Sequence, residues 1–170
     1  MDNPYVSLAR LTVESFVRDE RLIDPSVLEL PEGMRTRKAA FTTIKKDGVL
    51  RGCIGTVEPM HSDLAHEIVA NAYCAAFEDP RFPSVHTDEL AELTYSVDVV
   101  YPPEKVSDVR MLDPSTYGII VTSGVKKGVL LPMIEGVDTA FKQLEITLEK
   151  AGIDPREPYV VERFKVMRHQ

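Results

Sequence analysis

The chain has 170 residues, of which 44% are hydrophobic and 28% charged, with a formal net charge of −7. This balance is typical of one globular domain with its own core, and the acidic charge excludes a protein that binds nucleic acid mainly by neutralising phosphates. No apolar stretch follows Met1, and no run approaches the roughly 18 residues of a membrane span. We therefore expect a cytoplasmic protein that binds neither nucleic acid nor membrane.

The first half of the chain predicts a helix, a β-hairpin and a second helix, in that order. Asn3 caps the first helix, and apolar residues recur at helical spacing over residues 4–19. Residues 39–45 and 49–54 are β-branched and apolar around a turn dipeptide, which predicts the hairpin. Residues 64–77 form a long, largely apolar helical pattern that ends before the prolines that follow it.

The second half predicts three further groups of elements. After a short helix near Thr87, residues 93–101 alternate apolar and polar side chains and form the clearest strand in the chain. Residues 118–122 and 128–131 predict a second hairpin with two lysines at the tip of its loop. A third helix over residues 140–151 begins after Asp138 or Thr139, and a last strand covers residues 159–167. Hairpins with helices between them predict an α+β fold, in which helices cover a largely antiparallel sheet.

The most distinctive stretch is residues 50–56, with the sequence Leu-Arg-Gly-Cys-Ile-Gly-Thr, at the exit of the second hairpin strand. It places the Cys53 thiol between Gly52 and Gly55 and close to Arg51. Glycine lets other groups approach the backbone closely, and a nearby guanidinium lowers the pKa of a thiol. This stretch is therefore the first candidate for chemistry or binding.

Two roles for Cys53 are open at this point. The thiol could act as a nucleophile or as a ligand for a partner's metal, with the backbone amides of Gly52, Ile54 or Gly55 binding an oxyanion. Alternatively, Cys53 is a small buried residue where the strand packs tightly, as Cys74 is in its helix. The sequence identifies no general base for the thiol. It also has no Cys or His pair at zinc-ligand spacing, so we expect no metal, no cofactor and no disulfide.

Charged residues after the second helix offer a second set of candidates. Arg81 could join Arg51 to hold a small anionic ligand. The alternative is structural, because Arg81 could equally pair with Asp79 or Glu78 or donate to local carbonyl groups. His86 could serve as an acid or base, or could be an ordinary exposed histidine in a loop.

Three blocks of the sequence resemble, in order and spacing, the signature of the AMMECR domain family. They are residues 50–56, residues 79–83 with the sequence Asp-Pro-Arg-Phe-Pro, and residues 128–132 with the sequence Gly-Val-Leu-Leu-Pro. The chain ending, Glu-Arg-Phe at residues 162–164 and Arg-His at residues 168–169, resembles the bacterial branch called AmmeMemoRadiSam system protein A. The resemblance runs nearly end to end, and the first block is the most specific.

This resemblance implies a single compact α+β domain over residues 1–170, with a larger and a smaller lobe and a cleft near residues 50–56. It also implies an association with a Memo-like protein and a radical-SAM protein, without an established reaction. The chain departs from many members at Met133, where they carry glutamine, and in having no tryptophan.

Two functions follow from the residues and the resemblance together. The first is an accessory or binding module that acts with Memo-like and radical-SAM proteins through the cleft. The alternative is a thiol-dependent enzyme in which Cys53 attacks an anionic or acyl substrate. The candidate catalytic residue is Cys53, and the candidate ligand- or partner-binding residues are Arg51, Gly52, Gly55, Thr56, Arg81 and His86.

Overall fold

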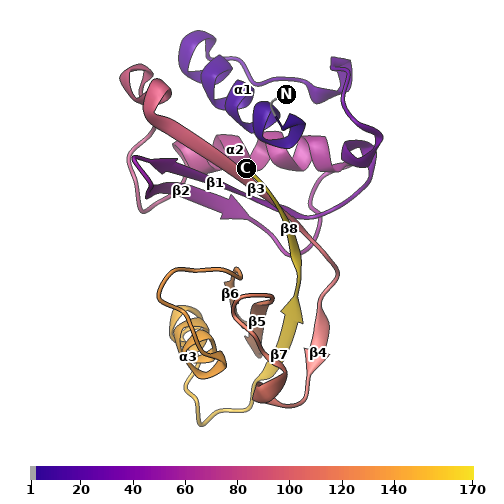
Figure 1. Ribbon diagram of the computed structural model, residues 1–170, viewed down its shortest axis with the longest axis vertical. Coiled ribbons are helices and arrows are strands. Elements are labelled where there is room, and N and C mark those ends of the chain that lie inside the picture. The colour runs from indigo at the N-terminus through magenta and orange to yellow at the C-terminus, as the bar shows by residue number, and fades with distance from the viewer. Residues whose placement is uncertain (1–2) are drawn as a thin grey trace. The chain divides into compact units, whose positions relative to one another are not determined.

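The computed structural model describes residues 3–170, which form two compact units (Figure 1). The first unit contains the chain up to Val100 together with Met167–Gln170. The second unit is the intervening segment, Tyr101–Val166. Each unit has its own four-stranded sheet and its own hydrophobic core. The predicted α+β fold is confirmed, with two sheets where the sequence suggested one.

The two long helices of the first unit begin at side chains that cap them. Asn3 caps α1 (Pro4–Asp19) because its side chain accepts a hydrogen bond from the Tyr5 N–H at 3.1 Å. Asp63 caps α2 (Leu64–Phe77) in the same way. Proline after α2 ends that helix, as the sequence predicts. None of the helices described within residues 3–170 is long and apolar enough to cross a membrane.

The sheet of the first unit has the strand order β2-β1-β3-β8, so β2 is an edge strand. Helices α1 and α2 lie over one face of this sheet (Figure 1). Ala40, Thr42 and Ile44 are buried at alternate positions of β1, as expected for a strand with one face against a core. The strands are β1 (Ala40–Lys46), β2 (Val49–Gly55), β3 (Leu93–Val100) and β8 (Val166–His169).

Short 3₁₀ helices connect the larger elements. One of them, η3, follows the loop after α2 and matches the short helix predicted near residue 87. The four are η1 (Pro25–Val27), η2 (Glu32–Arg35), η3 (Thr87–Glu92) and η4 (Val109–Met111).

The second unit has the strand order β4-β7-β5-β6, with α3 packed against β5 and β6. Helix α3 (Ala140–Ala151) begins at Thr139, whose hydroxyl accepts a hydrogen bond from the Lys142 N–H. It ends at Gly152, whose φ of 65° lies in the left-handed region that glycine adopts without strain. The strands are β4 (Glu104–Val106), β5 (Gly118–Ser123), β6 (Lys126–Leu130) and β7 (Val160–Phe164).

Two strand predictions are wrong in detail. The second hairpin turns at residues 124–125, so Lys126 and Lys127 lie in β6 and not in its loop. The predicted last strand is in fact two strands, β7 and β8, which belong to different sheets. Alternation alone could not reveal this division, because both strands continue the same pattern on either side of Lys165. The three-residue strand β4 and helix η4 were not predicted.

Candidate functional site

A β-bulge in the hairpin separates the two residues expected to act together. Ile44 pairs with Gly52 and Lys45 pairs with Leu50, so the register passes over Arg51. A bulge changes the direction of the side chain at that position. Arg51 and Cys53, although two residues apart on one strand, therefore contact different groups.

The Arg51 guanidinium binds one segment of the first unit with four hydrogen bonds. It donates to both carboxylate oxygens of Glu89, each at 2.9 Å, and to the carbonyl oxygens of Pro83 and Ser84 at 2.8 and 3.2 Å. Arg51 is 9% exposed. Four of its five N–H groups are thus used within the fold.

Glu89 also brings His86 into this cluster. The same carboxylate accepts a hydrogen bond from the His86 backbone N–H at 3.0 Å. His86 as a whole is exposed. The hydrogen bonds from Arg51 lower the pKa of Glu89 to about 2. The predicted residues Arg51 and His86 are therefore connected through a carboxylate that sequence analysis did not single out.

Asp79 and Arg81 cap the free edge of β2 at Cys53. The Cys53 N–H donates to Asp79 Oδ2 at 3.0 Å, and Arg81 Nη2 donates to the Cys53 carbonyl oxygen at 3.2 Å. The two side chains also pair with each other, with Arg81 Nη2 2.7 Å from Asp79 Oδ2. They take the place of a neighbouring strand at this edge, which would otherwise leave backbone groups unpaired.

The charge of Asp79 depends on this arrangement. Hydrogen bonds from the Arg81 side chain, and further ones from the backbone N–H groups of Cys53 and Arg81, lower the pKa of Asp79 to about 2. Its side chain is 1% exposed, whereas that of Arg81 is 53% exposed. The structural alternative considered for Arg81, a pair with Asp79, is the one present in the fold.

The Cys53 thiol is half-buried and has one hydrogen-bond partner among the described residues. Thr43 Oγ1 donates to Sγ at 3.2 Å from the neighbouring strand β1. Burial raises the pKa of Cys53, and the opposing effects of the Thr43 hydrogen bond and the Arg81 charge are smaller. The expectation that Arg51 lowers this pKa is wrong, because the bulge directs its guanidinium to Glu89. Both cysteines of the chain are free thiols.

The two glycines of the stretch allow close backbone contacts within the first unit. A Cβ at Gly52 would lie 2.0 Å from the Ala75 carbonyl oxygen of α2. A Cβ at Gly55 would lie 2.3 Å from the Ala40 carbonyl oxygen of β1. Neither distance is possible for a real side chain, so the packing of β2 requires glycine at both positions.

Thr56 contacts a buried acid that sequence analysis missed. Glu67, in α2, is 1% exposed and accepts hydrogen bonds from the backbone N–H groups of Met60 and His61 at 2.9 and 3.0 Å. The Thr56 hydroxyl lies 3.3 Å from Glu67 Oε1 and donates to the Glu58 carbonyl oxygen at 2.6 Å. A glutamate on the core-facing side of a largely apolar helix was the available signal.

The C-terminal residues are integrated into the first unit. Arg168 forms a bidentate pair with buried Asp98 at 2.7 and 2.8 Å. The His169 ring stacks on Tyr5, with ring centroids 3.8 Å apart, and its Nδ1 lies 3.2 Å from Asn3 Nδ2. Residues near a terminus are often frayed. Here His169 instead contacts Tyr5 and Asn3 at the start of α1.

Most of the predicted residues thus belong to one structural feature, the contact of residues 79–89 with β2, which we call the clamp on β2. One segment, residues 79–89, contacts Arg51 through Glu89 and Cys53 through Asp79 and Arg81, while Thr56 belongs to the Glu67 cluster.

None of the predicted residues lines the cavity of about 510 Å³ found in the second unit. Within residues 3–170, no three His, Cys, Asp or Glu side chains lie together as metal ligands would.

Comparison with known proteins gives the same relationship along nearly the whole chain. The family model AMMECR1 matches residues 6–170. The chain belongs to the AMMECR1 family. A protein of Thermotoga maritima is 46% identical over 171 residues, which cover 99% of this chain and 98% of that protein. A protein of Clostridium acetobutylicum is also 46% identical over 169 residues, but the chain spans only 36% of its length.

A solved structure of this fold also exists. The crystal structure of an uncharacterized protein from Pyrococcus horikoshii aligns with a TM-score of 0.90 and 29% identity, covering 96% of this chain and 88% of that one. The relatives and the family model agree on membership of the AMMECR1 family.

Proposed function

We propose that this AMMECR1-family chain is a binding module without a reaction of its own, which acts with Memo-like and radical-SAM proteins through the surface around residues 50–56. The observation that supports this proposal most is that the charged groups near Cys53 are paired with each other within the fold. Arg51 is buried and paired with Glu89, and Arg81 is paired with Asp79, so both guanidinium groups already bind carboxylates of the chain itself.

The state of the thiol supports the same proposal. A nucleophilic cysteine is usually activated by a lowered pKa or by an adjacent base. Burial raises the pKa of Cys53. Its hydrogen-bond partner is the Thr43 hydroxyl, which is not a base.

Docking would use the exposed side of this region. Val49 and Leu50, at the start of edge strand β2, are 69% and 38% exposed, and Arg81 retains an exposed guanidinium beside the carbonyl oxygen of Cys53. Arginine is enriched at protein interfaces, and exposed apolar side chains supply surface that binding would remove from water.

Binding to purified Memo-like and radical-SAM proteins from the same organism tests the proposal, measured by calorimetry or biolayer interferometry. We expect Leu50→Asp to weaken binding at least tenfold, because it places a charge in the docking surface. Val125→Asp is the matched control, since Val125 is fully exposed in the β5–β6 turn. Absence of binding to both proteins, or equal binding by Leu50→Asp, would overturn the proposal.

A thiol-dependent enzyme is the second candidate, favoured by the Thr43 hydrogen bond and the Arg81 charge, which both act to stabilise a thiolate. Alkylation of Cys53 by iodoacetamide, followed by mass spectrometry from pH 6 to pH 10, distinguishes the two. A binding module predicts slower alkylation of native Cys53 than of glutathione at pH 7. Faster alkylation would favour the enzyme, as would loss of an observed activity in Cys53→Ser with partner binding retained.

A further inference from the structure

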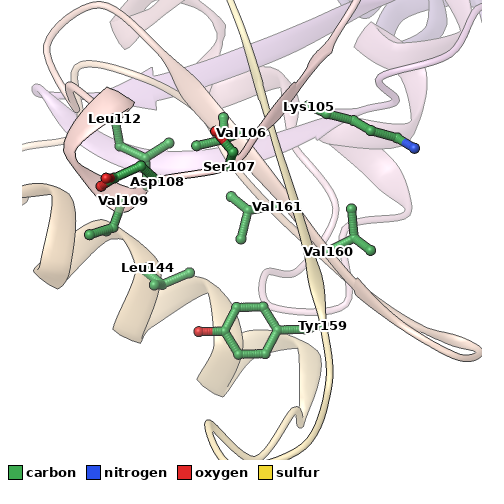
Figure 2. A pocket seen from close by; sticks show the side chains of 10 residues that line it. All are labelled: Lys105, Val106, Ser107, Asp108, Val109, Leu112, Leu144, Tyr159, Val160 and Val161. Carbon is green, nitrogen blue, oxygen red and sulfur yellow. The ribbon is translucent and has the colours of Figure 1, made fainter.

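A second candidate site lies in the other unit, in a cavity of about 510 Å³ (Figure 2). Its walls come from three directions: Val106 and Val161 on paired strands, Val109 and Leu112 at η4, and Leu144 on α3. Tyr159, just before β7, also lines the cavity, as do Lys105, Ser107, Asp108 and Val160. The volume lies within the range of about 300 to 1,000 Å³ that small-molecule sites occupy.

Contacts made by a residue outside the lining join the elements that surround the cavity. Arg163, on β7, donates to the Met111 carbonyl oxygen of η4 at 2.5 Å and pairs with Glu104 at 2.6 Å. The same guanidinium lies over the Tyr117 ring, 4.1 Å from its centre. The hydrogen bond to Met111 joins η4 to β7. Val109 is 42% exposed, which leaves apolar surface that a ligand could cover.

The charges around the cavity favour an uncharged occupant. The Asp108 carboxylate is already paired with Arg110, which donates to both of its oxygens. Figure 2 shows the Lys105 side chain extending away from the other lining side chains. A charged ligand would lose its hydration here without gaining a counter-ion, which is unfavourable.

The Tyr159 hydroxyl can give such an occupant an orientation. Within residues 3–170, the Tyr159 hydroxyl makes no hydrogen bond with another residue. In Figure 2 it points toward Leu144, on the side of the cavity formed by α3. A tyrosine hydroxyl both donates and accepts, so it can bind a hydroxyl or a carbonyl group.

We propose that this cavity binds a small, uncharged organic molecule, whose apolar body contacts the aliphatic walls and whose hydroxyl or carbonyl group bonds to Tyr159. The site is independent of the function proposed above, because all its residues belong to the second unit. The fit is one of size and polarity: apolar side chains supply most of the contact, and one polar group gives specificity.

Titration with p-cresol and with toluene tests the proposal, followed by ¹H–¹⁵N NMR on the full chain. We expect saturable shifts of amides in η4, α3 and β7 with both probes. Tyr159→Phe should weaken p-cresol binding about fivefold, the effect of one lost hydrogen bond, and leave toluene binding within twofold. Leu144→Trp, which fills the cavity, should weaken both at least tenfold.

Two further variants protect the test against a folding failure. Val109→Trp also fills the cavity from a half-exposed position, so it serves if Leu144→Trp does not fold. Val125→Trp, in the exposed turn of the same unit, should leave binding unchanged. Absence of saturable shifts at these amides, or binding that survives a folded cavity-filling variant, would overturn the proposal. Equal loss of both probes in Tyr159→Phe would overturn the role of the hydroxyl.

Discussion

The stretch around Cys53 and the cavity of the second unit differ in how their groups are satisfied. Around Cys53, carboxylates, guanidinium groups and edge backbone atoms all find partners within residues 51–89. In the cavity, aliphatic side chains and the Tyr159 hydroxyl face open space. The difference teaches that a distinctive sequence pattern can arise because the residues bond to one another within the fold. A cavity lined mainly by aliphatic residues of suitable size leaves no such pattern.

Removing the guanidinium of Arg51 should cause the largest loss of stability among the changes proposed for the two regions. Arg51→Met leaves the carboxylate of Glu89 and the carbonyl groups of Pro83 and Ser84 without their donor. We expect a loss of about 3 to 5 kcal/mol in the free energy of unfolding, the usual effect of breaking a buried ion pair. Urea denaturation measures it, and a loss below about 1 kcal/mol would mean that the cluster is dispensable.

Adding one methyl group to the stretch should be nearly as disruptive. Gly52→Ala places a Cβ against the backbone carbonyl of Ala75, which cannot rotate away. We expect a loss of about 3 kcal/mol, at the upper end for overpacked sites. Val49→Ala, on an exposed side chain of the same strand, is the control and should change stability by less than about 0.5 kcal/mol.

Acid should weaken the clamp on β2 in a defined pH range. The folded-state pKa values of Asp79 and Glu89, about 2, lie below their ordinary values of 3.8 and 4.5. Their stabilisation is therefore complete above about pH 5 and is lost as the pH falls toward 2. For Asp79 the loss is on the order of 2 kcal/mol. Urea denaturation at pH 6 and pH 3 should show a smaller pH dependence in Asp79→Asn, and an unchanged dependence would contradict this role.

The smallest effect is expected in the cavity. Tyr159→Phe removes a hydroxyl that has no partner within the described chain, so the free energy of unfolding should change by less than about 0.5 kcal/mol. Thermal unfolding measured beside that of Arg51→Met gives the contrast directly. A loss above about 1 kcal/mol in Tyr159→Phe would mean that its hydroxyl stabilises the fold.

Local signals were sufficient for most of the elements. Capping by Asn3 and Thr139 depends on neighbours in sequence, so both caps were visible in the pattern. The split of the last predicted strand into β7 and β8 was not visible, because sheet membership depends on which distant strand each segment pairs with.

The candidate site divides in the same way. The sequence by itself determined the family and the unusual stretch around Cys53, because residues 50–56 form a rare local combination of glycine, arginine and thiol. Only the tertiary structure decided what each residue contacts. The bulge at Arg51 and the clamp by residues 79–89 arise from groups that are distant in sequence, and burial then raises the pKa of the thiol. The physical reason is that a thiol's pKa depends on its surroundings in space.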